Sequence, residues 1–166
     1  MKRDHVQTPF AAPGRRNPTS GVSLYTGQPT IVFLTVCTLK QSPWLANKAA
    51  HESLYETWRN ATAWLVSDYI LMPDHLHLFC APGCKGAGIE NWILFWKRKF
   101  RRVHGNPDWR FQSRGWHHRL RSGESYSTKW RYMMENPVRK GLVGEVESWP
   151  FRGRVFDVWW NGGAKM

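Results

Sequence analysis

The stretch Tyr69-Ile-Leu-Met-Pro-Asp-His-Leu-His-Leu-Phe79 places two apolar runs on either side of a Met-Pro-Asp break. The first run ends a predicted strand over residues 64–71, and the second begins a predicted strand over residues 75–80. Because side chains alternate between the two faces of a strand, His75 and His77 leave the same side of the sheet. The stretch therefore predicts two consecutive strands joined by a short turn, with a pair of histidines on one face.

The histidine pair predicts a metal site. Two neutral imidazoles roughly 7 Å apart along a strand can direct their ring nitrogens onto one divalent cation. A zinc site is an alternative, because Cys80 and Cys84 follow within the next residues and zinc accepts N and S ligands. However, Cys80 lies an odd number of residues from both histidines, so a regular strand turns it to the opposite face. Histidines with a purely structural role, bonded to carbonyl groups, are the third alternative.

Further elements are predicted outward from this stretch. A continuous run rich in β-branched residues predicts a strand. Segments with helical or strand periodicity between turn residues predict three helices and one more strand. The predicted ranges are a strand at 30–38, helices at 47–63, 88–104 and 124–135, and an edge strand or hairpin at 109–121 around Gly115, with Asn136 as a boundary before Pro137. This order predicts a single α+β domain with a mainly antiparallel sheet and helices on one face.

The helix at 88–104 has the clearest helical periodicity in the chain. Apolar residues recur at spacings of three and four, which predicts a buried stripe. The stripe consists of Ile89, Ile93, Trp96, Phe100 and Val103. Four cations fall largely away from it, and we expect them to contact a phosphate backbone beside the metal site. These cations are Lys97, Arg98, Arg101 and Arg102.

Composition indicates a polyanionic partner. The 166 residues include 24 Lys and Arg against 12 Asp and Glu, a formal net charge of +12, together with 11 Trp. Nucleic acid is the expected partner for such a charge, and aromatic rings can stack on bases. No apolar run is long enough to span a membrane, and the first residues do not form a secretory signal. The odd and small number of cysteines favours free thiols in a reducing, intracellular compartment. We therefore expect a cytoplasmic, nucleoid-associated protein.

The chain divides into three predicted parts. Residues 1–22 are rich in Pro and Gly and include Arg15 and Arg16, which predicts a basic flexible arm able to follow a phosphate backbone. Residues 23–151 hold the predicted domain. Residues 152–166 form a C-terminal tail for which the sequence predicts no structure.

Tyr132 is the candidate nucleophile if the metal site acts on phosphodiesters. It lies on the predicted helix before Pro137, and Asn136 follows four residues later on the same face. An amide oxygen is a hard ligand that suits Mg²⁺ or Mn²⁺ and would complete a site with two imidazoles. Periodicity alone does not distinguish Tyr132 from an ordinary core tyrosine.

Two segments resemble a known family. The stretch Tyr69 to Phe79 is similar to the His-hydrophobic-His (HUH) strand of the small single-tyrosine transposases. The segment Tyr132-Met-Met-Glu-Asn-Pro-Val-Arg-Lys-Gly-Leu-Val143 resembles the nucleophile helix of their REP-associated branch. Trp109 to Arg121 and Ser148-Trp-Pro-Phe151 resemble the strand before that helix and the turn after it. The resemblance covers residues 30–151, and two long motifs in the right order make it specific.

The resemblance implies a ferredoxin-like sheet and a cut in single-stranded DNA that depends on Mg²⁺ or Mn²⁺. It implies a covalent 5′-phosphotyrosine with a free 3′-OH, and recognition of palindromic hairpins with a short single-stranded flank. His75 and His77 carry over as metal ligands and Tyr132 as the nucleophile. Asn136 takes the position where many relatives carry a Gln as third ligand, which keeps the carbonyl on an arm shorter by one carbon.

We therefore expect a DNA endonuclease and strand transferase, a transposase, that acts as a monomer or homodimer. A second subunit could supply the nucleophile in trans. A non-catalytic protein derived from a transposase, which binds hairpins or single-stranded nucleic acid including RNA, is the alternative. Tyr126 is the next candidate nucleophile after Tyr132. Further predicted phosphate contacts are Arg114, Arg119, Arg121, Arg139 and Lys140.

Overall fold

The computed structural model describes residues 30–83, 86–120 and 123–158. The strands are β1 (Val32–Cys37), β2 (Trp64–Leu71), β3 (His75–Pro82), β4 (Trp116–Arg119) and β5 (Arg152–Arg154). The helices are α1 (Lys48–Asn60), α2 (Ile89–His104), α3 (Gly123–Met134) and α4 (Asn136–Arg139), with short 3-10 turns η1 (Leu39–Gln41) and η2 (Val146–Ser148). The predicted ranges agree closely with these elements up to α2.

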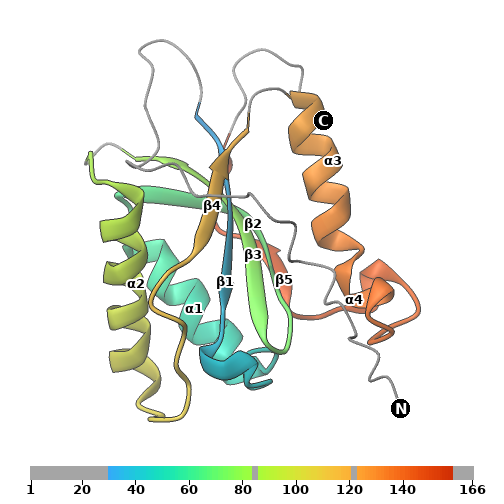
Figure 1. The fold of residues 1–166 in the computed structure, drawn as a ribbon, viewed down its shortest axis with the longest axis horizontal. Coiled ribbons are helices and arrows are strands. Elements are labelled where there is room, and N and C mark those ends of the chain that lie inside the picture. The colour runs from blue at the N-terminus through green and yellow to red at the C-terminus, as the bar shows by residue number, and fades with distance from the viewer. Residues whose placement is uncertain (1–29, 84–85, 121–122, 159–166) are drawn as a thin grey trace, which may run out of the picture.

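The strands form one antiparallel sheet in the order β4-β1-β3-β2-β5. Apart from the 3-10 turn η1, the chain from β1 to β4 follows the ferredoxin-like βαββαβ order β1-α1-β2-β3-α2-β4, and β3 lies between β1 and β2 in the sheet. Figure 1 shows this sheet at the centre of the molecule with helices on both sides. The predicted α+β class with an antiparallel sheet is confirmed.

The Met-Pro-Asp break forms the turn between β2 and β3. The turn is closed by a backbone bond in which the N–H of Met72 donates to the carbonyl of His75 over 2.8 Å. Leu71 then pairs with Leu76, and the alternation along β3 buries Leu76 and Leu78 on one side of the sheet. The two histidines consequently lie on the other side, as predicted.

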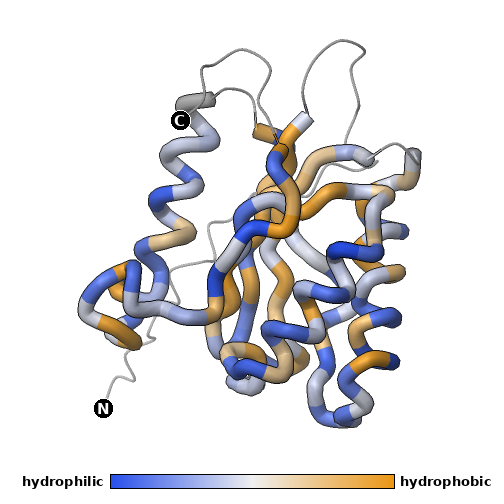
Figure 2. The backbone as a smooth tube through the Cα atoms, turned by 180° about the vertical axis from the view of Figure 1, so that it is seen from behind, coloured by the Kyte–Doolittle hydropathy of each residue, from blue (hydrophilic) through white to orange (hydrophobic). Residues whose placement is uncertain are grey.

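Helices α1 and α2 cover the side of the sheet that holds Leu76 and Leu78, which we call the α1/α2 face. Its core includes Trp58 of α1 and Trp96 of α2, whose ring centroids are 5.7 Å apart. Figure 2 shows hydrophobic segments along the central strands that this core covers. Burial of these large aromatic side chains contributes to the hydrophobic stabilisation of this face of the sheet.

The predicted apolar stripe of α2 is correct at four of its five positions. Val103 is 55% exposed, so its predicted burial is wrong. The ring of His104 occupies that place instead, because its centroid lies 4.2 Å from Phe100 and 5.3 Å from Trp109. Trp92, which the stripe did not include, is buried in the same core.

The prediction that helices cover one face holds for α1 and α2 only. The C-terminal end of α3 packs on the opposite side of the sheet, which we call the α3 face, with Met133 and Met134 beside Phe33 and Phe79. Trp149 closes this second core, and its indole N–H donates to the carbonyl of Leu71 over 2.9 Å. The described part of α3 is mostly hydrophilic elsewhere (Figure 2).

One predicted strand and one predicted domain boundary need correction. Of the described residues from 109 to 120, only those of β4 form a strand, and the earlier part contributes one isolated bridge, Thr38 to Phe111. Gly115 lies between this bridge and β4. A Cβ at this position would come within 2.9 Å of the Leu34 side chain, so the close approach to β1 favours glycine. The sheet also extends past the predicted domain end at residue 151, since β5 pairs with β2. The predicted arm 1–22 lies outside the described residues.

Candidate functional site

His75 and His77 lie side by side on the α3 face of β3. Their ring centroids are 4.9 Å apart and the planes are nearly perpendicular, at 74°. His77 is only 3% exposed and stacks on the ring of Phe33 of β1 at 5.2 Å. The period-2 alternation of the strand therefore brings both imidazoles to one place.

A neighbouring oxygen holds the Nδ1 atom of each ring. The Nδ1–H of His75 donates to a carboxylate oxygen of Asp74 over 2.6 Å. The Nδ1 of His77 lies 2.8 Å from the hydroxyl oxygen of Thr35, its cross-strand partner on β1. Such contacts fix the tautomer and the ring orientation of histidines that bind metals through Nε2.

The Nε2 atom of His77 gives the most direct test of whether the pair suits a metal. This atom is buried and has no hydrogen-bond partner in the described part of the chain. A buried nitrogen without a partner is costly unless a ligand satisfies it. Burial, then the charges of His75 and Lys129, lower the pKa of His77 to about 3. The ring is therefore neutral at physiological pH, which is the form that binds a cation.

Tyr132 lies next to this pair, although it belongs to a different element. Its ring centroid on α3 is 6.1 Å from that of His77, at an interplanar angle of 62°. Two cations accompany the phenol: the guanidinium carbon of Arg139 is 4.8 Å from the ring centroid, and Nζ of Lys129 is 5.8 Å from it. The fold thus joins the predicted nucleophile to the predicted metal ligands within one chain.

Asn136 is the first residue of α4 and is buried, at 6% exposure. Its backbone carbonyl accepts a hydrogen bond from the N–H of Lys140 over 3.0 Å. Within the described ranges no three His, Cys, Asp or Glu side chains gather into a metal-binding group. A third protein ligand would therefore be of another type, such as an amide, and the ligand role of Asn136 remains a prediction.

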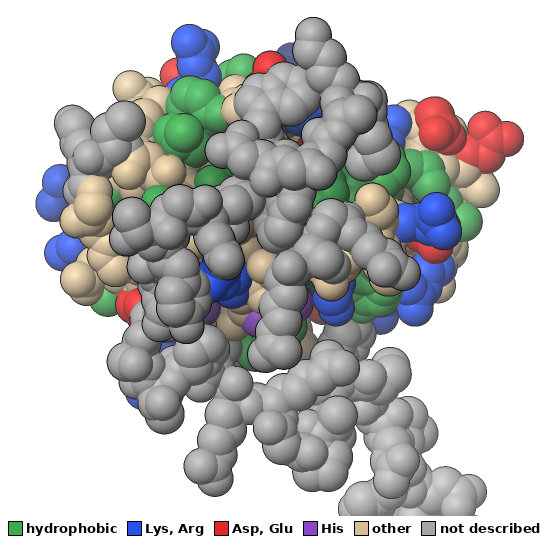
Figure 3. Space-filling view, turned by 90° about the horizontal axis from the view of Figure 1, so that it is seen from above, with side chains coloured by type: hydrophobic (Ala, Val, Ile, Leu, Met, Phe, Trp, Pro, Cys, Tyr) green, Lys and Arg blue, Asp and Glu red, His purple; other side chains and the backbone are tan. Residues whose placement is uncertain are grey.

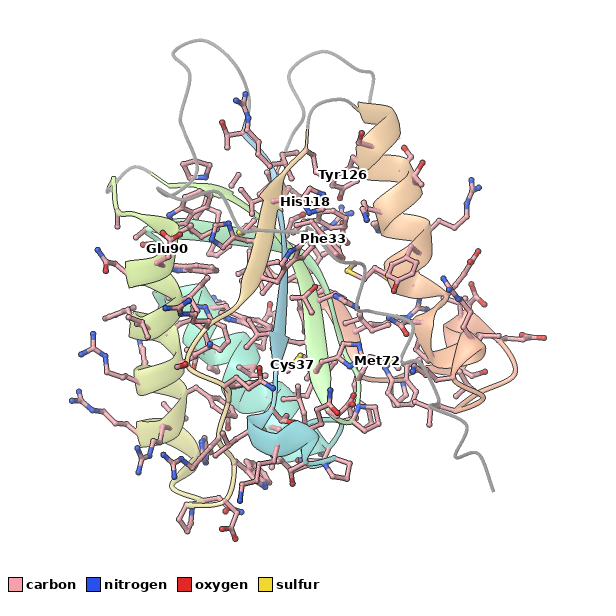
Figure 4. The ribbon with its side chains drawn as sticks, viewed as in Figure 1. Phe33, Cys37, Met72, Glu90, His118 and Tyr126 are labelled. Atoms are coloured by element: carbon pink, nitrogen blue, oxygen red, sulfur yellow. The ribbon has the colours of Figure 1, made fainter. Side chains whose placement is uncertain are left out.

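Tyr126, the second candidate nucleophile, is engaged elsewhere. Its hydroxyl donates to Oδ2 of Asp68 over 2.8 Å, and its ring lies 4.5 Å from Phe79. Burial and the adjacent Asp68 carboxylate raise the pKa of Tyr126. Figure 4 shows Tyr126 above the α3 face, on the same side of the sheet as Phe33. The Tyr126 hydroxyl is directed to Asp68, whereas the Tyr132 ring lies beside His77, so these contacts favour Tyr132 as the nucleophile.

Asp68 joins three elements around α3. Besides the hydrogen bond from the Tyr126 hydroxyl, its carboxylate accepts hydrogen bonds from Nε and Nη2 of Arg154 over 3.0 and 2.9 Å. The Asp68 side chain is only 8% exposed. Asn at this position would keep the shape but lose the charge and one acceptor oxygen, leaving a donor unsatisfied. We expect Asp68→Asn to lower the free energy of unfolding by about 1–3 kcal/mol, measured by urea denaturation.

Asp157 provides the matched control, because it also contacts Arg154, over 3.3 Å, but is 65% exposed. An exposed ion pair contributes little, so Asp157→Asn should change the free energy of unfolding by less than about 1 kcal/mol. Equal shifts in the two variants would contradict the structural role of Asp68.

The zinc alternative receives no support from the described residues. Cys80 is fully buried on the α1/α2 face, opposite to the histidines, and burial raises the pKa of its thiol. Cys84 lies outside the described residues. His117 is also buried on the α1/α2 face, where its Nε2 lies 3.0 Å from a carboxylate oxygen of Glu90. Figure 4 shows Glu90 on α2, on the far side of the sheet from Tyr126.

The predicted position of the α2 cations beside the metal site is wrong. The apolar stripe of α2 packs on the α1/α2 face, so the sheet separates its cations from His75 and His77. Nζ of Lys97 donates to the carbonyl of Gln112 over 2.8 Å, and burial lowers the pKa of Lys97 to about 8. This lysine therefore ties a loop to the helix. The other three cations predicted to contact phosphate on α2 are exposed, namely Arg98, Arg101 and Arg102.

The other predicted phosphate contacts are dispersed. Arg114 is exposed before β4, and Arg119 pairs with Val32, which puts it on the α1/α2 face. Arg139 and Lys140 are exposed at the end of α4, and Arg139 contacts the Tyr132 ring. Figure 3 shows Lys and Arg side chains at several separate places around the surface seen from above. Arg15, Arg16 and Arg121 lie outside the described residues.

Sequence reasoning missed three residues of the site. Asp74 directly precedes His75 and is a recognisable signal, since carboxylates commonly orient metal-binding histidines. Lys129 precedes Tyr132 by one helical turn, a spacing that puts both on one side of a helix. Thr35 has no such signal, because only the register between β1 and β3 places it opposite His77.

Comparison with known proteins adds two relationships. No family model matches the chain. It is similar to the REP-associated tyrosine transposase of Escherichia coli (strain K12), with 29% identity over 91 residues, which is 52% of this chain and 52% of that protein. The chain thus matches about half the length of this relative.

A solved structure of a REP-associated tyrosine transposase bound to a REP hairpin has a similar fold. The TM-score is 0.63 with 20% sequence identity, over 89% of this chain and 99% of that chain. The similarity to the Escherichia coli protein confirms the predicted resemblance, and the structural likeness confirms the single α+β domain. Of the described helices, none is long and apolar enough to cross a membrane.

Proposed function

We propose that the chain is a member of the REP-associated branch of the single-tyrosine transposases, and that it cuts and joins single-stranded DNA with the help of Mg²⁺ or Mn²⁺. The observation that carries this proposal is the 6.1 Å separation between the Tyr132 and His77 rings. A nucleophile, a pair of oriented imidazoles and two cations meet on one face of one chain. The same proximity favours a nucleophile that acts in cis.

His75 and His77 would hold the metal through Nε2, and Asn136 is the proposed third ligand. The metal, when bound, withdraws negative charge from a non-bridging phosphate oxygen and fixes the orientation of the phosphate. The chain supplies the remaining parts of the reaction. Asp74 keeps the His75 ring in the tautomer that presents Nε2, and Thr35 contacts Nδ1 of His77 and thereby orients that ring.

Tyr132 carries out the covalent step. Its phenolic oxygen attacks the scissile phosphorus in line, the bond to the 3′-oxygen breaks, and the phenolic proton ends on the leaving oxygen as a 3′-OH. The DNA is then joined to the protein as a 5′-phosphotyrosine. Because one ester replaces another, the reverse attack by a 3′-OH joins strands without ATP.

An aromatic strip on the α3 face supports the single-stranded flank of a hairpin as substrate. Trp116 and His118 of β4 lie 4.7 Å apart, and His118 lies 5.9 Å from Phe33, which in turn stacks on His77. Figure 4 shows His118 and Phe33 on the side that faces α3. Aromatic side chains on a sheet surface stack on unpaired bases. The relative bound to a REP hairpin and the charge of +12 agree with a hairpin substrate.

Trp116→Ala should weaken binding of a hairpin that carries a single-stranded flank. Loss of one stacked base costs about 1–3 kcal/mol, or roughly 5- to 150-fold in affinity. Fluorescence anisotropy with a labelled hairpin measures the change. A blunt hairpin without the flank is the control and should bind both proteins equally; an equal loss on both hairpins would rule out the stacking role.

The proposed activity is tested by incubating the wild-type protein with end-labelled hairpin DNA and separating the products on a denaturing gel. We expect a protein–DNA adduct with Mg²⁺ or Mn²⁺ and none with EDTA or with RNA of the same sequence. Hairpin binding without an adduct across a varied hairpin library would instead support the non-catalytic binder.

A further inference from the structure

We propose that Lys129 is a catalytic residue that contacts a non-bridging oxygen of the scissile phosphate during attack by Tyr132. The inference rests on the proposed function, because it assigns a role within the same covalent step. Neither the resemblance to the transposases nor the sequence periodicity assigns this lysine. Its position between the nucleophile helix and the sheet carries the inference.

The helix brings Lys129 to the nucleophile. Lys129 precedes Tyr132 by three residues on α3, so one turn separates the two side chains on the same side of the helix. Lys129 is half-buried, whereas the adjacent Trp130 and Arg131 are exposed. Its side chain therefore lies against the α3 face of the sheet, with part of its surface still in contact with solvent.

Two ring contacts locate the ammonium group more closely. Nζ of Lys129 is 5.7 Å from the ring centroid of Phe33 on β1 and 5.8 Å from that of Tyr132 on α3. The Phe33 ring stacks on His77, so the ammonium lies one ring away from the metal-binding face of the histidine pair. Rings from the sheet and from the helix thus flank the ammonium, on the same side of the sheet as the histidine pair.

The charge of the ammonium also suits an anionic substrate. A positive charge beside the proposed cation site attracts a phosphate diester, whose negative charge the metal ion and the ammonium can then share.

Arg139 approaches the same phenol from a different element. Its guanidinium lies 4.8 Å from the Tyr132 ring and extends from the exposed end of α4, whereas Lys129 lies deeper, against Phe33. Negative charge increases on the non-bridging oxygens as the phenol attacks, and a cation already in position stabilises that charge without reorganisation. The half-buried location gives Lys129 the larger effect, since water screens an exposed cation more strongly.

The first test compares rates of adduct formation in Lys129→Met, Lys129→Arg and the matched control Arg131→Met. We expect Lys129→Met to slow adduct formation by about 100-fold, the loss typical of one preorganised donor to a reacting oxyanion. Hairpin affinity should change by less than about 5-fold, because one phosphate contact contributes little to total binding. Lys129→Arg should recover part of the rate, and Arg131→Met should match wild type.

The second test separates phosphate contact from simple packing. A methylphosphonate at the scissile position removes the charge of one non-bridging oxygen. The ratio of the wild-type rate of adduct formation to the Lys129→Met rate should therefore fall towards 1 for at least one of the two methylphosphonate isomers. If this ratio of rates is unchanged for both isomers, the catalytic role is overturned. Adduct formation by Lys129→Met at the wild-type rate on normal DNA would overturn it as well. Absence of an adduct with wild type would instead overturn the proposed function itself.

Discussion

Tyr132→Phe should abolish the covalent protein–DNA adduct while the protein still binds hairpin DNA. The change removes one oxygen, the atom proposed to form the bond to phosphorus, and leaves the ring that contacts His77 and the two cations. Loss of a covalent nucleophile typically lowers the rate by on the order of 10⁴-fold or more. A denaturing gel with labelled hairpin DNA and Mn²⁺ measures the adduct, and anisotropy measures binding.

Tyr126→Phe is the matched control on the same helix. Its hydroxyl donates to Asp68, so the change should lower the free energy of unfolding by about 1.5–3 kcal/mol, the contribution of a hydrogen bond to a charged group. The adduct should still form at a temperature where the variant is folded. Adduct formation by Tyr132→Phe that disappears only when Tyr126 is also replaced would transfer the nucleophile role to Tyr126.

His75→Ala and His77→Ala should each remove metal-dependent cleavage. Each change deletes one of two imidazoles whose centroids are 4.9 Å apart, and a single remaining histidine cannot chelate the cation. We expect the adduct yield of both variants to match that of wild type in EDTA. Titration with Mn²⁺, followed by its paramagnetic resonance signal, should show the loss of the bound ion directly.

Graded variants distinguish a metal ligand from a residue that only supports the fold. Thr35→Val removes the hydroxyl beside Nδ1 of His77 but keeps the ligand, so Mn²⁺ affinity should fall by about 10- to 100-fold without complete loss. His117→Ala removes a buried histidine on the α1/α2 face and should leave Mn²⁺ affinity unchanged. Unfolding of His77→Ala that only zinc reverses would favour the structural zinc site instead.

The local patterns predicted the elements around the histidines well. Residues 64–71 form β2 as predicted, and α2 buries Ile89, Ile93, Trp96 and Phe100. A short, mostly apolar run that ends at the Met-Pro-Asp turn indicates β2, and the three-four spacing of apolar residues indicates which side of α2 is buried. The short strand β5 has no such record, because three residues, Arg152 to Arg154, are too few to show a period.

The position of the cations could not be predicted in the same way. Periodicity shows that the α2 cations lie opposite the α2 stripe, but it does not show which face of the sheet receives that stripe. The crossover between β3 and β4 puts α2 on the α1/α2 face and turns its cations away from His77. Lys129, which received no role from the sequence, is the cation that the fold brings within 5.8 Å of the Tyr132 ring.

By itself, the sequence determined that His75 and His77 share one side of a strand, because neighbouring side chains on a strand must alternate. It also determined that Lys129 and Tyr132 share one side of a helix, because their separation is nearly one turn. Only the tertiary structure decided that these two sides face each other, and that Thr35 holds Nδ1 of His77. Strand register and helix docking depend on contacts between residues far apart in the chain, which no local spacing records.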